Sequence, residues 1–404
     1  MNYRNNNLHI ENISAQKIIK KFGTPSYCYS LDKIKSNIKN FKKSFRSINP
    51  LLCFAVKSNS NIQILKEIKK MGMGADVVSK GELLVALKAG INSKKIVFSG
   101  VGKSQEEIKL AINKNILLIN TESESEIDLI EKIAKVKNKK INIGIRLNPN
   151  IDSRSIRKIS TGKKDDKFGL TEKNFLKIIK KYKTSNNLNV KCLSVHIGSQ
   201  ITSYKPYERM LNVIRSVIRK SNYNFDFIDL GGGMGIKYNN DTKIFNYNKY
   251  NSIIKKFLTY HKSKIIFEPG RSIIGDTALL LTKVLYIKKT NKIKFIILDA
   301  AMNDFMRPAL YNATHSIIPI NKNKKTIKKK HEFVGPICET TDKFLSISKF
   351  QMLNEGDCLA ICDVGAYGMV LSSNYNLRTK PAEILINKSL SKVIKKRQKL
   401  INII

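Results

Sequence analysis

The sequence predicts an α/β barrel of the TIM-like (β/α)8 type, followed by a mostly β C-terminal domain. Over the first two thirds of the chain, short β-rich runs alternate eight times with Lys-rich amphipathic stretches, as is typical of parallel strands joined by helices. After about Ile273 this alternation stops, and strand-like runs follow one another through short, turn-rich connections. The 404 residues suit two domains, and a hydrophobic content of 42% excludes wholesale disorder.

The eight predicted barrel strands are Leu52–Val56, Ala75–Val78, Ile96–Ser99, Ile116–Ile119, Ile141–Leu147, Leu193–Ile197, Phe225–Leu230 and Ile265–Phe267. Between them apolar residues recur at helical spacing, as Ile62, Leu65 and Ile68 do in the first such stretch. We therefore expect the barrel domain to cover residues 25–272.

The strand-like runs of the second domain are Ala278–Ile287, Lys294–Asp299, Gln351–Leu353 and Cys358–Cys362. We expect this β-rich domain to cover residues 273–404. Residues 1–24 contain no barrel strand, and packing on either domain, including the C-terminal one, stays open for them.

The chain is strongly basic, with 74 Lys+Arg against 31 Asp+Glu and a formal net charge of +43. Only 12 of the basic residues are Arg, and the 62 Lys are spread along the whole length with Ile and Asn. Nucleic-acid binders concentrate their charge and favour Arg for bidentate contacts. We therefore interpret the charge as a composition bias at tolerant surface positions and expect no nucleic-acid partner. A polycationic RNA-binding protein remains an alternative.

Several classes of protein are disfavoured by what the sequence lacks. The sequence contains no run of eighteen apolar residues, so it predicts no membrane span. Its first residues, Met1–Leu8, are Asn-rich and lack the apolar core of a secretory signal. The six Cys form no CxxC pair and no metal-type cluster with the five His, so we expect neither a disulfide framework nor a metal. Cys53, Cys192 and Cys358 lie in apolar runs and are predicted to be buried. We expect a cytoplasmic protein with no membrane partner.

Polar residues follow several predicted barrel strands, at the end where barrel enzymes carry their catalytic groups. Lys57 follows the first strand, where a desolvated amine can form a Schiff base, although most Lys of this chain face solvent. Gly231–Gly233 follow the seventh strand, where glycine amides can bind a phosphate or simply form a tight turn. His196, at the end of the sixth strand, can stack on a planar cofactor or fill the core.

The last barrel strand ends in Glu268-Pro269-Gly270-Arg271. A carboxylate here can hold the protonated pyridine nitrogen of a cofactor, and Arg271 can bind a phosphate or a carboxylate. An ion pair that caps the strand is the alternative.

Three segments of the second domain also offer chemistry. Arg307 and Tyr311 are four residues apart, so in a helix they share a face that can grip a carboxylate, whereas in a loop they do not. Cys338 beside Glu339 offers a proton donor, and Tyr367 offers a phenol on a Gly-flanked turn. Ordinary turns remain the alternative for the last two.

Five further segments carry a resemblance to a known family: Phe54–Asn59, Gly74–Ser79, Arg146–Asn150, Lys167–Gly169 and His196–Gln200. Together with the segments above, they run in family order from Gly23 to Glu383. The chain resembles the fold-type III, pyridoxal-phosphate-dependent amino-acid decarboxylases, whose barrel is of the alanine-racemase type. Among them it is most similar to those that act on meso-2,6-diaminopimelate.

The resemblance implies a role for each site residue. Lys57 would form the Schiff base with pyridoxal 5'-phosphate, His196 would stack on its ring, and Glu268 would keep the ring nitrogen protonated. The other residues implied to bind the cofactor are Ser199, Gly231, Gly232, Gly233, Pro269, Gly270, Arg271 and Tyr367. Those implied to bind substrate are Arg271, Arg307, Tyr311, Glu339 and Tyr367. Cys338 would deliver a proton across a homodimer interface, which implies two shared active sites.

The expected reaction is decarboxylation of meso-2,6-diaminopimelate to L-lysine and CO2, the last step of lysine biosynthesis. The substrate's second amino-acid end needs a cation and an anion, and Arg307 with Glu339 supplies that pair. A decarboxylase of another basic amino acid (of the ornithine, arginine or carboxynorspermidine type) remains an alternative. An alanine-racemase-type enzyme is a second one, although racemisation gives no reason for the Cys338-Glu339 turn.

Overall fold

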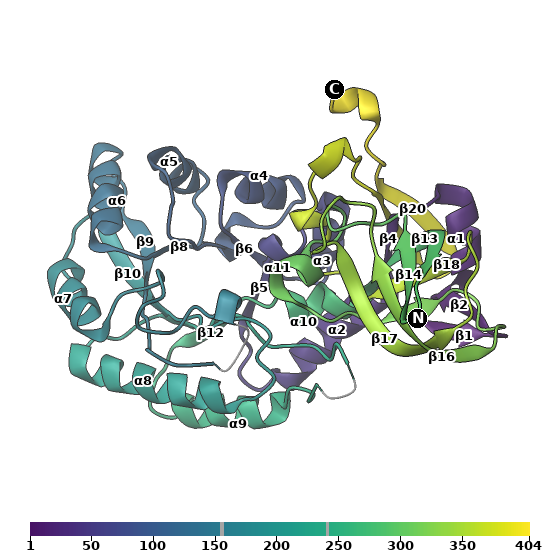
Figure 1. Cartoon of the computed structure of the whole chain (residues 1–404). Coiled ribbons are helices and arrows are strands. Elements are labelled where there is room, and N and C mark those ends of the chain that lie inside the picture. The colour runs from purple at the N-terminus through teal and green to yellow at the C-terminus, as the bar shows by residue number, and fades with distance from the viewer. Residues whose placement is uncertain (154–156, 240–241) are drawn as a thin grey trace. The chain divides into compact units, whose positions relative to one another are not determined.

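The computed structural model of the chain describes residues 1–153, 157–239 and 242–404. It divides into two compact units, which Figure 1 shows as a helix-rich and a strand-rich part. The barrel unit comprises residues 38–236 and 243–272, and the β unit comprises residues 1–37, 237–242 and 273–404.

The barrel unit contains eight parallel strands that close in the order β10-β11-β12-β5-β6-β7-β8-β9. The strands are β5 (Leu51–Ala55), β6 (Gly74–Val77), β7 (Ile96–Phe98), β8 (Leu118–Thr121), β9 (Ile141–Arg146), β10 (Leu188–Ser194), β11 (Phe227–Asp229) and β12 (Lys264–Phe267). Each overlaps one of the eight predicted runs, so the predicted TIM-like barrel is confirmed.

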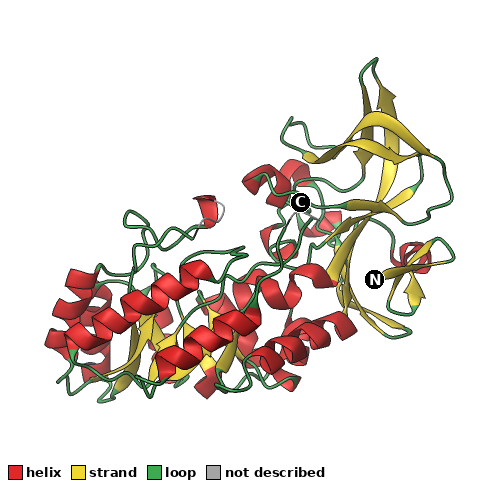
Figure 2. Ribbon diagram, turned by 90° about the horizontal axis from the view of Figure 1, so that it is seen from below, coloured by secondary structure: helices red, strands yellow, loops and turns green. Residues whose placement is uncertain are grey.

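Helices cover the outside of these strands, as Figure 2 shows. They are α2 (Leu31–Ser44), which begins in the β unit, α3 (Ile62–Lys70), α4 (Lys80–Lys88), α5 (Gln105–Asn113), α6 (Glu124–Val136), α7 (Glu172–Tyr182), α8 (Lys205–Ser221) and α9 (Tyr247–Leu258), with the short α10 (Arg271–Ile274) after β12. Their boundaries follow local chemistry. Side chains of Ser79, Ser104 and Ser123 accept a hydrogen bond from the first turns of α4, α5 and α6.

The barrel interior is filled by apolar side chains that point inward from the strands. One core cluster joins Cys53, Val97, Leu118, Cys192 and Ile266 from five different strands. Burial raises the pKa of the Cys53 and Cys192 thiols, so both behave as small hydrophobes, as predicted.

The β unit is built on a nine-stranded sheet with the main order β17-β16-β14-β13-β4-β19-β20, in which β18 pairs with β13 and β15. Its strands are β4 (Ser26–Ser30), β13 (Ala278–Lys289), β14 (Ile293–Leu298), β15 (Ile317–Pro319), β16 (Thr326–Val334), β17 (Lys343–Gln351), β18 (Cys358–Cys362), β19 (Ala382–Asn387) and β20 (Leu390–Lys395). A small sheet holds β1 (Asn2–Arg4), β2 (Asn7–Ile10) and β3 (Ile13–Ser14), followed by α1 (Ala15–Phe22); α11 (Arg307–Tyr311) follows β14.

Residues 1–24, whose packing the sequence left open, belong to the β unit, where Leu8, Ile10 and Ile18 share a core with strand residues such as Leu279. The boundaries differ from the predicted ones at two places, because residues 25–37 and 237–242, expected in the barrel domain, also belong to the β unit. The first of these segments contains β4, which is wholly buried and pairs with both β13 and β19.

Two predictions within the β unit are wrong. The run Gln351–Leu353 is not a strand of its own, since only Gln351 lies in β17, which extends back to Lys343. The alternation of apolar and polar residues over Lys343–Lys349 is too weak to be recognised as a strand, because the middle of this segment faces solvent. Cys358 was expected to be buried and is only half-buried, because it begins β18 near the solvent-exposed Gly356 turn.

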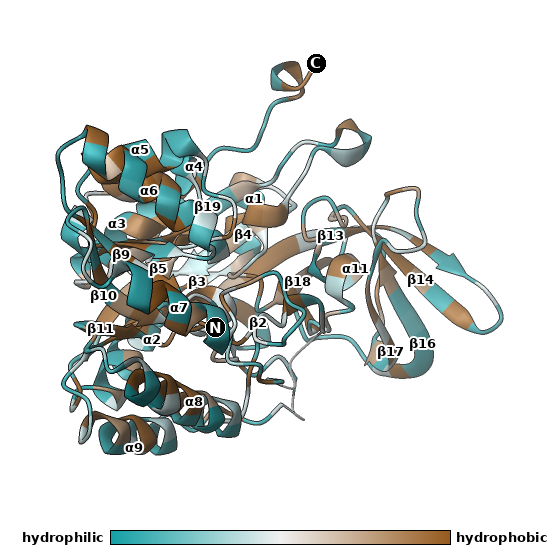
Figure 3. Cartoon of the chain, turned by 90° about the vertical axis from the view of Figure 1, so that its left-hand side faces the viewer, coloured by the Kyte–Doolittle hydropathy of each residue, from teal (hydrophilic) through white to brown (hydrophobic). Residues whose placement is uncertain are grey.

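In Figure 3 the barrel helices alternate between hydrophilic and hydrophobic residues, and β16, which contains Lys328–Lys330, is hydrophilic over much of its length. In the described ranges no helix combines the length and apolar character needed to cross a bilayer.

Candidate active site

Lys57 lies at the carboxyl end of the first barrel strand, in a single 3-10 turn (Val56–Ser58) that follows β5. Its Nζ lies 2.6 Å from Oδ2 of Asp76, a fully buried residue of the neighbouring strand β6. The register of the two strands pairs Ala55 with Asp76 and so brings the two side chains together. The Lys57 side chain stays 35% exposed, so its amine is oriented by Asp76 and still accessible.

Asp76 lies at the same end of the barrel as two further buried carboxyl groups, Asp229 on β11 and Glu268 just after β12. Burial, Asp229 and Asp76 raise the pKa of Glu268 well above its ordinary value, and Lys57 opposes this rise. Burial also raises the pKa of Asp229, whose Oδ2 accepts a hydrogen bond of 3.0 Å from Asn120. The nearby Asp229 therefore favours the protonated form of Glu268, whose Oε1 also accepts a hydrogen bond from Oγ of Ser99 at 3.2 Å.

The glycine turn after β11 is packed so closely that side chains are excluded. Gly231 and Gly233 have φ of +62° and +92°, values that favour glycine. A Cβ on Gly232 would lie 2.1 Å from the Glu268 carbonyl oxygen, and one on Gly231 would lie 2.5 Å from Nδ1 of His196.

The glycine turn also determines the state of His196. The Gly232 N–H donates to Nδ1 of His196 at 3.1 Å, so this nitrogen carries a lone pair. Burial, Arg146 and Lys57 lower the pKa of His196 well below its ordinary value. The imidazole is therefore neutral, which suits a ring that stacks on another ring.

Arg271 and Ser199 form the second side of the same region. The guanidinium Nη2 of Arg271 lies 3.0 Å from Oγ of Ser199, and Arg271 is buried. The loop that carries Ser199 lies against the glycine turn, because the Ile201 N–H donates to the Gly233 carbonyl at 2.9 Å. A hydroxyl, a guanidinium and closely approachable amides together form a donor set for an anion.

These residues fit pyridoxal phosphate. The donor set of Ser199, Arg271 and the glycine turn matches a phosphate group, and no side chain at Gly231–Gly233 would fill that space. The other carboxylate oxygen of Asp76, Oδ1, is buried and has no hydrogen-bond partner within the described part of the chain. Glu268 provides the carboxyl group that a pyridine nitrogen requires. The Pro269 carbonyl accepts from the Ala55 N–H at 3.3 Å, and Gly270 packs against Ser58, which fix this segment against the Lys57 turn.

In the β unit, Arg307 and Tyr311 begin and end the short helix α11, so of the two alternatives left open, helix and loop, the structure has the helix. Arg307 is 2% exposed, and its Nη1 donates to the Tyr238 hydroxyl at 2.9 Å and to Nε2 of His315 at 2.7 Å. Tyr311 is half-buried.

Cys338 and Glu339 lie exposed in the connection between β16 and β17. Glu339 accepts hydrogen bonds from the Tyr375 hydroxyl and, at 2.8 Å, from Thr341, and these bonds lower its pKa. Tyr367 is half-buried in the turn after β18 and has a φ of +55°.

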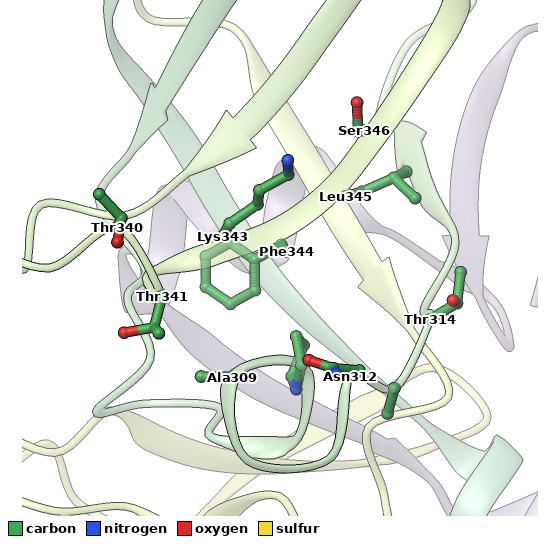
Figure 4. Close-up of a pocket in the computed structure, with 11 residues that line it drawn as sticks. Ala309, Asn312, Thr314, Thr340, Thr341, Lys343, Phe344, Leu345 and Ser346 are labelled. Carbon is green, nitrogen blue, oxygen red and sulfur yellow. The ribbon is translucent and has the colours of Figure 1, made fainter.

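A pocket of about 410 Å³ in the β unit connects two of these segments. Its wall contains Pro308 and Ala309 of α11 and also Thr340 and Thr341, which directly follow Glu339. Figure 4 shows Thr340 and Thr341 on one side of this pocket and Thr314 on the other, with the Phe344 ring between them. The α11 segment and the residues that directly follow Glu339 therefore line a common pocket.

Sequence reasoning assigned no role to four residues that the structure places in or beside the barrel site. Asp76 and Asp229 were visible as acids inside apolar runs, where a buried charge demands a partner. Arg146 pairs with Glu122 at 2.7 Å and contacts the His196 carbonyl at 3.4 Å. Neither residue of that pair gave a comparable signal, because both stand at strand ends where polar residues are common.

Comparison with known proteins identifies the family. Residues 31–275 match the family described as "Pyridoxal-dependent decarboxylase, pyridoxal binding domain". Diaminopimelate decarboxylase of Aquifex aeolicus is 39% identical over 403 residues, covering 98% of this chain and 95% of that protein. The Helicobacter pylori (strain J99) enzyme is 41% identical, covering 95% and 96%.

The solved structures agree. The crystal structure of Helicobacter pylori diaminopimelate decarboxylase complexed with L-lysine has a TM-score of 0.91 and 41% identity, and the match covers 96% of this chain and 97% of that one. A family match over more than half of the chain, full-length relatives and a shared fold lead to one conclusion. The chain belongs to the pyridoxal-phosphate-dependent decarboxylases, in the diaminopimelate decarboxylase family.

Proposed function

We propose that this protein removes CO2 from meso-2,6-diaminopimelate and releases L-lysine. One observation carries the proposal: in a chain of this family, the Lys57 amine is held 2.6 Å from Asp76, beside the buried Glu268. The crystallised Helicobacter pylori relative has L-lysine bound, and L-lysine is the product expected here. Because the product keeps the L centre, the carboxyl group lost is the one at the D centre.

Each barrel residue has a distinct task. When bound, pyridoxal phosphate supplies a conjugated ring that accepts the electron pair left on the substrate carbon as CO2 departs. Lys57 would hold the cofactor through its amine, and Glu268 would hold a proton at the ring nitrogen. The neutral His196 would support the ring face, and Ser199, Arg271 and the glycine turn would bind the phosphate.

The residues of the β unit would act on the rest of the substrate. We propose that Arg307 and Tyr311 bind the carboxylate of the amino-acid end that is retained, and that Glu339 binds its ammonium. Tyr367 would contact cofactor and substrate. The lost carboxyl group must be replaced by one proton at the same carbon, and Cys338 would deliver it.

We further propose a cytoplasmic homodimer with two shared active sites, in which the exposed Cys338-Glu339 turn enters the site of the partner subunit. Mixing the inactive Lys57→Ala variant with the impaired Cys338→Ala variant tests this, with the residual activity of Cys338→Ala alone subtracted. If the sites are shared, random reassociation restores about a quarter of wild-type activity, since half of the dimers carry one intact site. No restoration after verified subunit exchange would contradict the shared site.

The proposed reaction is tested with purified protein, pyridoxal phosphate and meso-diaminopimelate. We expect CO2 and L-lysine in equal amounts, measured by gas release and chiral chromatography, and no turnover by Lys57→Ala. Ornithine and arginine serve as competing substrates. Faster CO2 release from either would favour the alternative decarboxylases, and inversion without CO2 would favour a racemase.

A further inference from the structure

A fully buried histidine contacts Arg307 in the β unit. His315 lies between α11 and β15, and none of its surface is exposed. Its Nε2 lies 2.7 Å from Nη1 of Arg307, and its Nδ1 lies 2.8 Å from the carbonyl oxygen of Cys362, at the end of β18.

These two partners determine where the imidazole proton is. A carbonyl oxygen only accepts hydrogen bonds, so Nδ1 of His315 carries the proton that is donated to Cys362. A guanidinium only donates, so Nε2 carries the lone pair that accepts from Arg307. Both contacts require the same neutral tautomer.

The histidine ring is also fixed in orientation. Phe305 and Tyr238 pack edge-on against it, with ring centroids 4.6 and 4.9 Å away and interplanar angles of 85° and 68°. Tyr238 in turn stacks under the Arg307 guanidinium at 4.7 Å and accepts from the same Nη1 at 2.9 Å. The plane of the guanidinium is therefore held by two neutral acceptors whose own rings are locked.

A neutral acceptor has an advantage at this place. An Asp or Glu would hold Arg307 equally well, but its charge would compete with any carboxylate that Arg307 is meant to bind. A neutral imidazole fixes the geometry without adding a further negative charge beside the guanidinium. A guanidinium grips a carboxylate through two parallel N–H bonds only when its plane is correctly oriented.

We infer that His315 is a positioning residue for substrate recognition: its Nε2 lone pair holds Arg307 in the plane that binds the retained carboxylate of meso-diaminopimelate. The inference rests on the proposed function, in which Arg307 binds that carboxylate. L-lysine corresponds to the substrate without its reacting carboxylate, so it keeps the carboxylate that Arg307 binds. D-lysine corresponds to the substrate without that retained carboxylate. His315 therefore serves the binding of L-lysine and not that of D-lysine.

Three substitutions separate positioning from packing. His315→Gln places an amide oxygen near the position of Nε2 and keeps an acceptor for Arg307. His315→Asn places an amide near Nδ1 and keeps only the donor to Cys362. His315→Phe keeps the aromatic packing and removes both hydrogen bonds.

His331 provides a matched control in the same unit. It is also fully buried, its Nδ1 lies 2.7 Å from the Lys329 carbonyl oxygen, and it packs against Phe333 and Phe350. In the described part of the chain its Nε2 has no hydrogen-bond partner. The same three substitutions at His331 should leave KM unchanged.

We expect His315→Asn and His315→Phe to raise the KM for meso-diaminopimelate and the inhibition constant of L-lysine by about 10- to 100-fold, because one charge-assisted bond to the carboxylate is lost. His315→Gln should stay within about threefold of wild type, and inhibition by D-lysine should change by less than about twofold in all variants. In an Arg307→Ala background, His315→Phe should have no further effect on KM.

Equal losses for L-lysine and D-lysine, or a His315→Gln variant as impaired as His315→Phe, would overturn the inference in favour of a packing role. Wild-type KM values in both the Asn and Phe variants would overturn it as well. Thermal unfolding of every variant checks folding, and if His315→Phe does not fold, the comparison of Gln with Asn decides. Failure of the wild-type protein to decarboxylate meso-diaminopimelate would instead overturn the proposed function.

Discussion

Replacement of Gly232 by alanine should damage the cofactor site while leaving the barrel intact. The added Cβ would lie 2.1 Å from the Glu268 carbonyl oxygen, whereas real Cβ contacts essentially never fall below 3.0 Å. The two segments cannot part freely, because the Glu268 N–H donates to the Gly231 carbonyl at 2.8 Å. Relief of the clash therefore requires the glycine turn or the Glu268 segment to move by about 1 Å.

This displacement sets the expected magnitude. Such a shift in either segment moves the phosphate donors relative to Glu268, and a misplacement of about 1 Å can reduce catalysis by about 100-fold. The strain of overpacking should also lower the free energy of unfolding by about 1–3 kcal/mol. We expect kcat/KM to fall by about 100-fold and cofactor affinity to fall by about 10-fold or more.

The assay combines titration of the apoenzyme with pyridoxal phosphate, followed by absorbance, and CO2 release from meso-diaminopimelate. Gly102→Ala is the matched control, because a Cβ at Gly102 meets no atom within 4 Å. It should bind cofactor and turn over substrate as the wild type does. If Gly232→Ala shows wild-type affinity and turnover, the close approach of the glycine turn to Glu268 is not required for the site, and the assignment of this turn to the phosphate is refuted.

Three further predictions concern individual residues. Glu268→Gln should lower kcat by about 100-fold or more, because a neutral amide cannot support a protonated ring nitrogen; Glu332→Gln, in the β unit, is the control and should retain wild-type kcat. Burial raises the pKa of Asp304 from 3.8 to about 7, so its contribution to stability is fully present below about pH 4 and is lost as the pH rises through 7. Chemical denaturation between pH 4 and 8 should show Asp304→Asn with a flatter stability profile than the wild type, by up to about 4 kcal/mol. Cys338→Ala should slow product protonation or misdirect it, measured as the rate and stereochemistry of solvent deuterium incorporation into lysine, whereas Cys358→Ala should do neither.

Each of these has a clear contrary result. A Glu268→Gln variant with wild-type kcat would remove Glu268 from the reaction. Parallel stability profiles for Asp304→Asn and wild type would show that this carboxyl group does not retain a proton in the folded state. Unchanged deuterium incorporation in Cys338→Ala would assign the final proton to another donor.

Much of the barrel was predictable because its signals are local. A parallel strand buried on both faces must be a continuous apolar run, and the helix after it must carry apolar residues at helical spacing. The strands β5 to β12 therefore each overlap a run recognisable in the sequence. Lys57, Glu268 and Arg271 could be placed at one rim because the carboxyl ends of parallel strands meet there.

The tertiary structure alone determined which groups pair. Asp76 stands 19 residues after Lys57 in the chain and reaches its amine only because β5 and β6 pair in one particular register. Likewise Tyr238 and His315 contact Arg307, and Cys362 contacts His315, from three separate segments.

By itself, the amino-acid sequence determined the alternation of elements, the rim residues and the family. It did not determine the membership of β4 in the second sheet, the raised pKa of Asp229 and Glu268, or the tautomers of His196 and His315. The physical reason is that apolar periodicity depends on residues that are close together in the sequence. Strand partners, pKa shifts and hydrogen-bond directions depend instead on groups far apart in the chain, which only the packed fold brings within a few ångströms of one another.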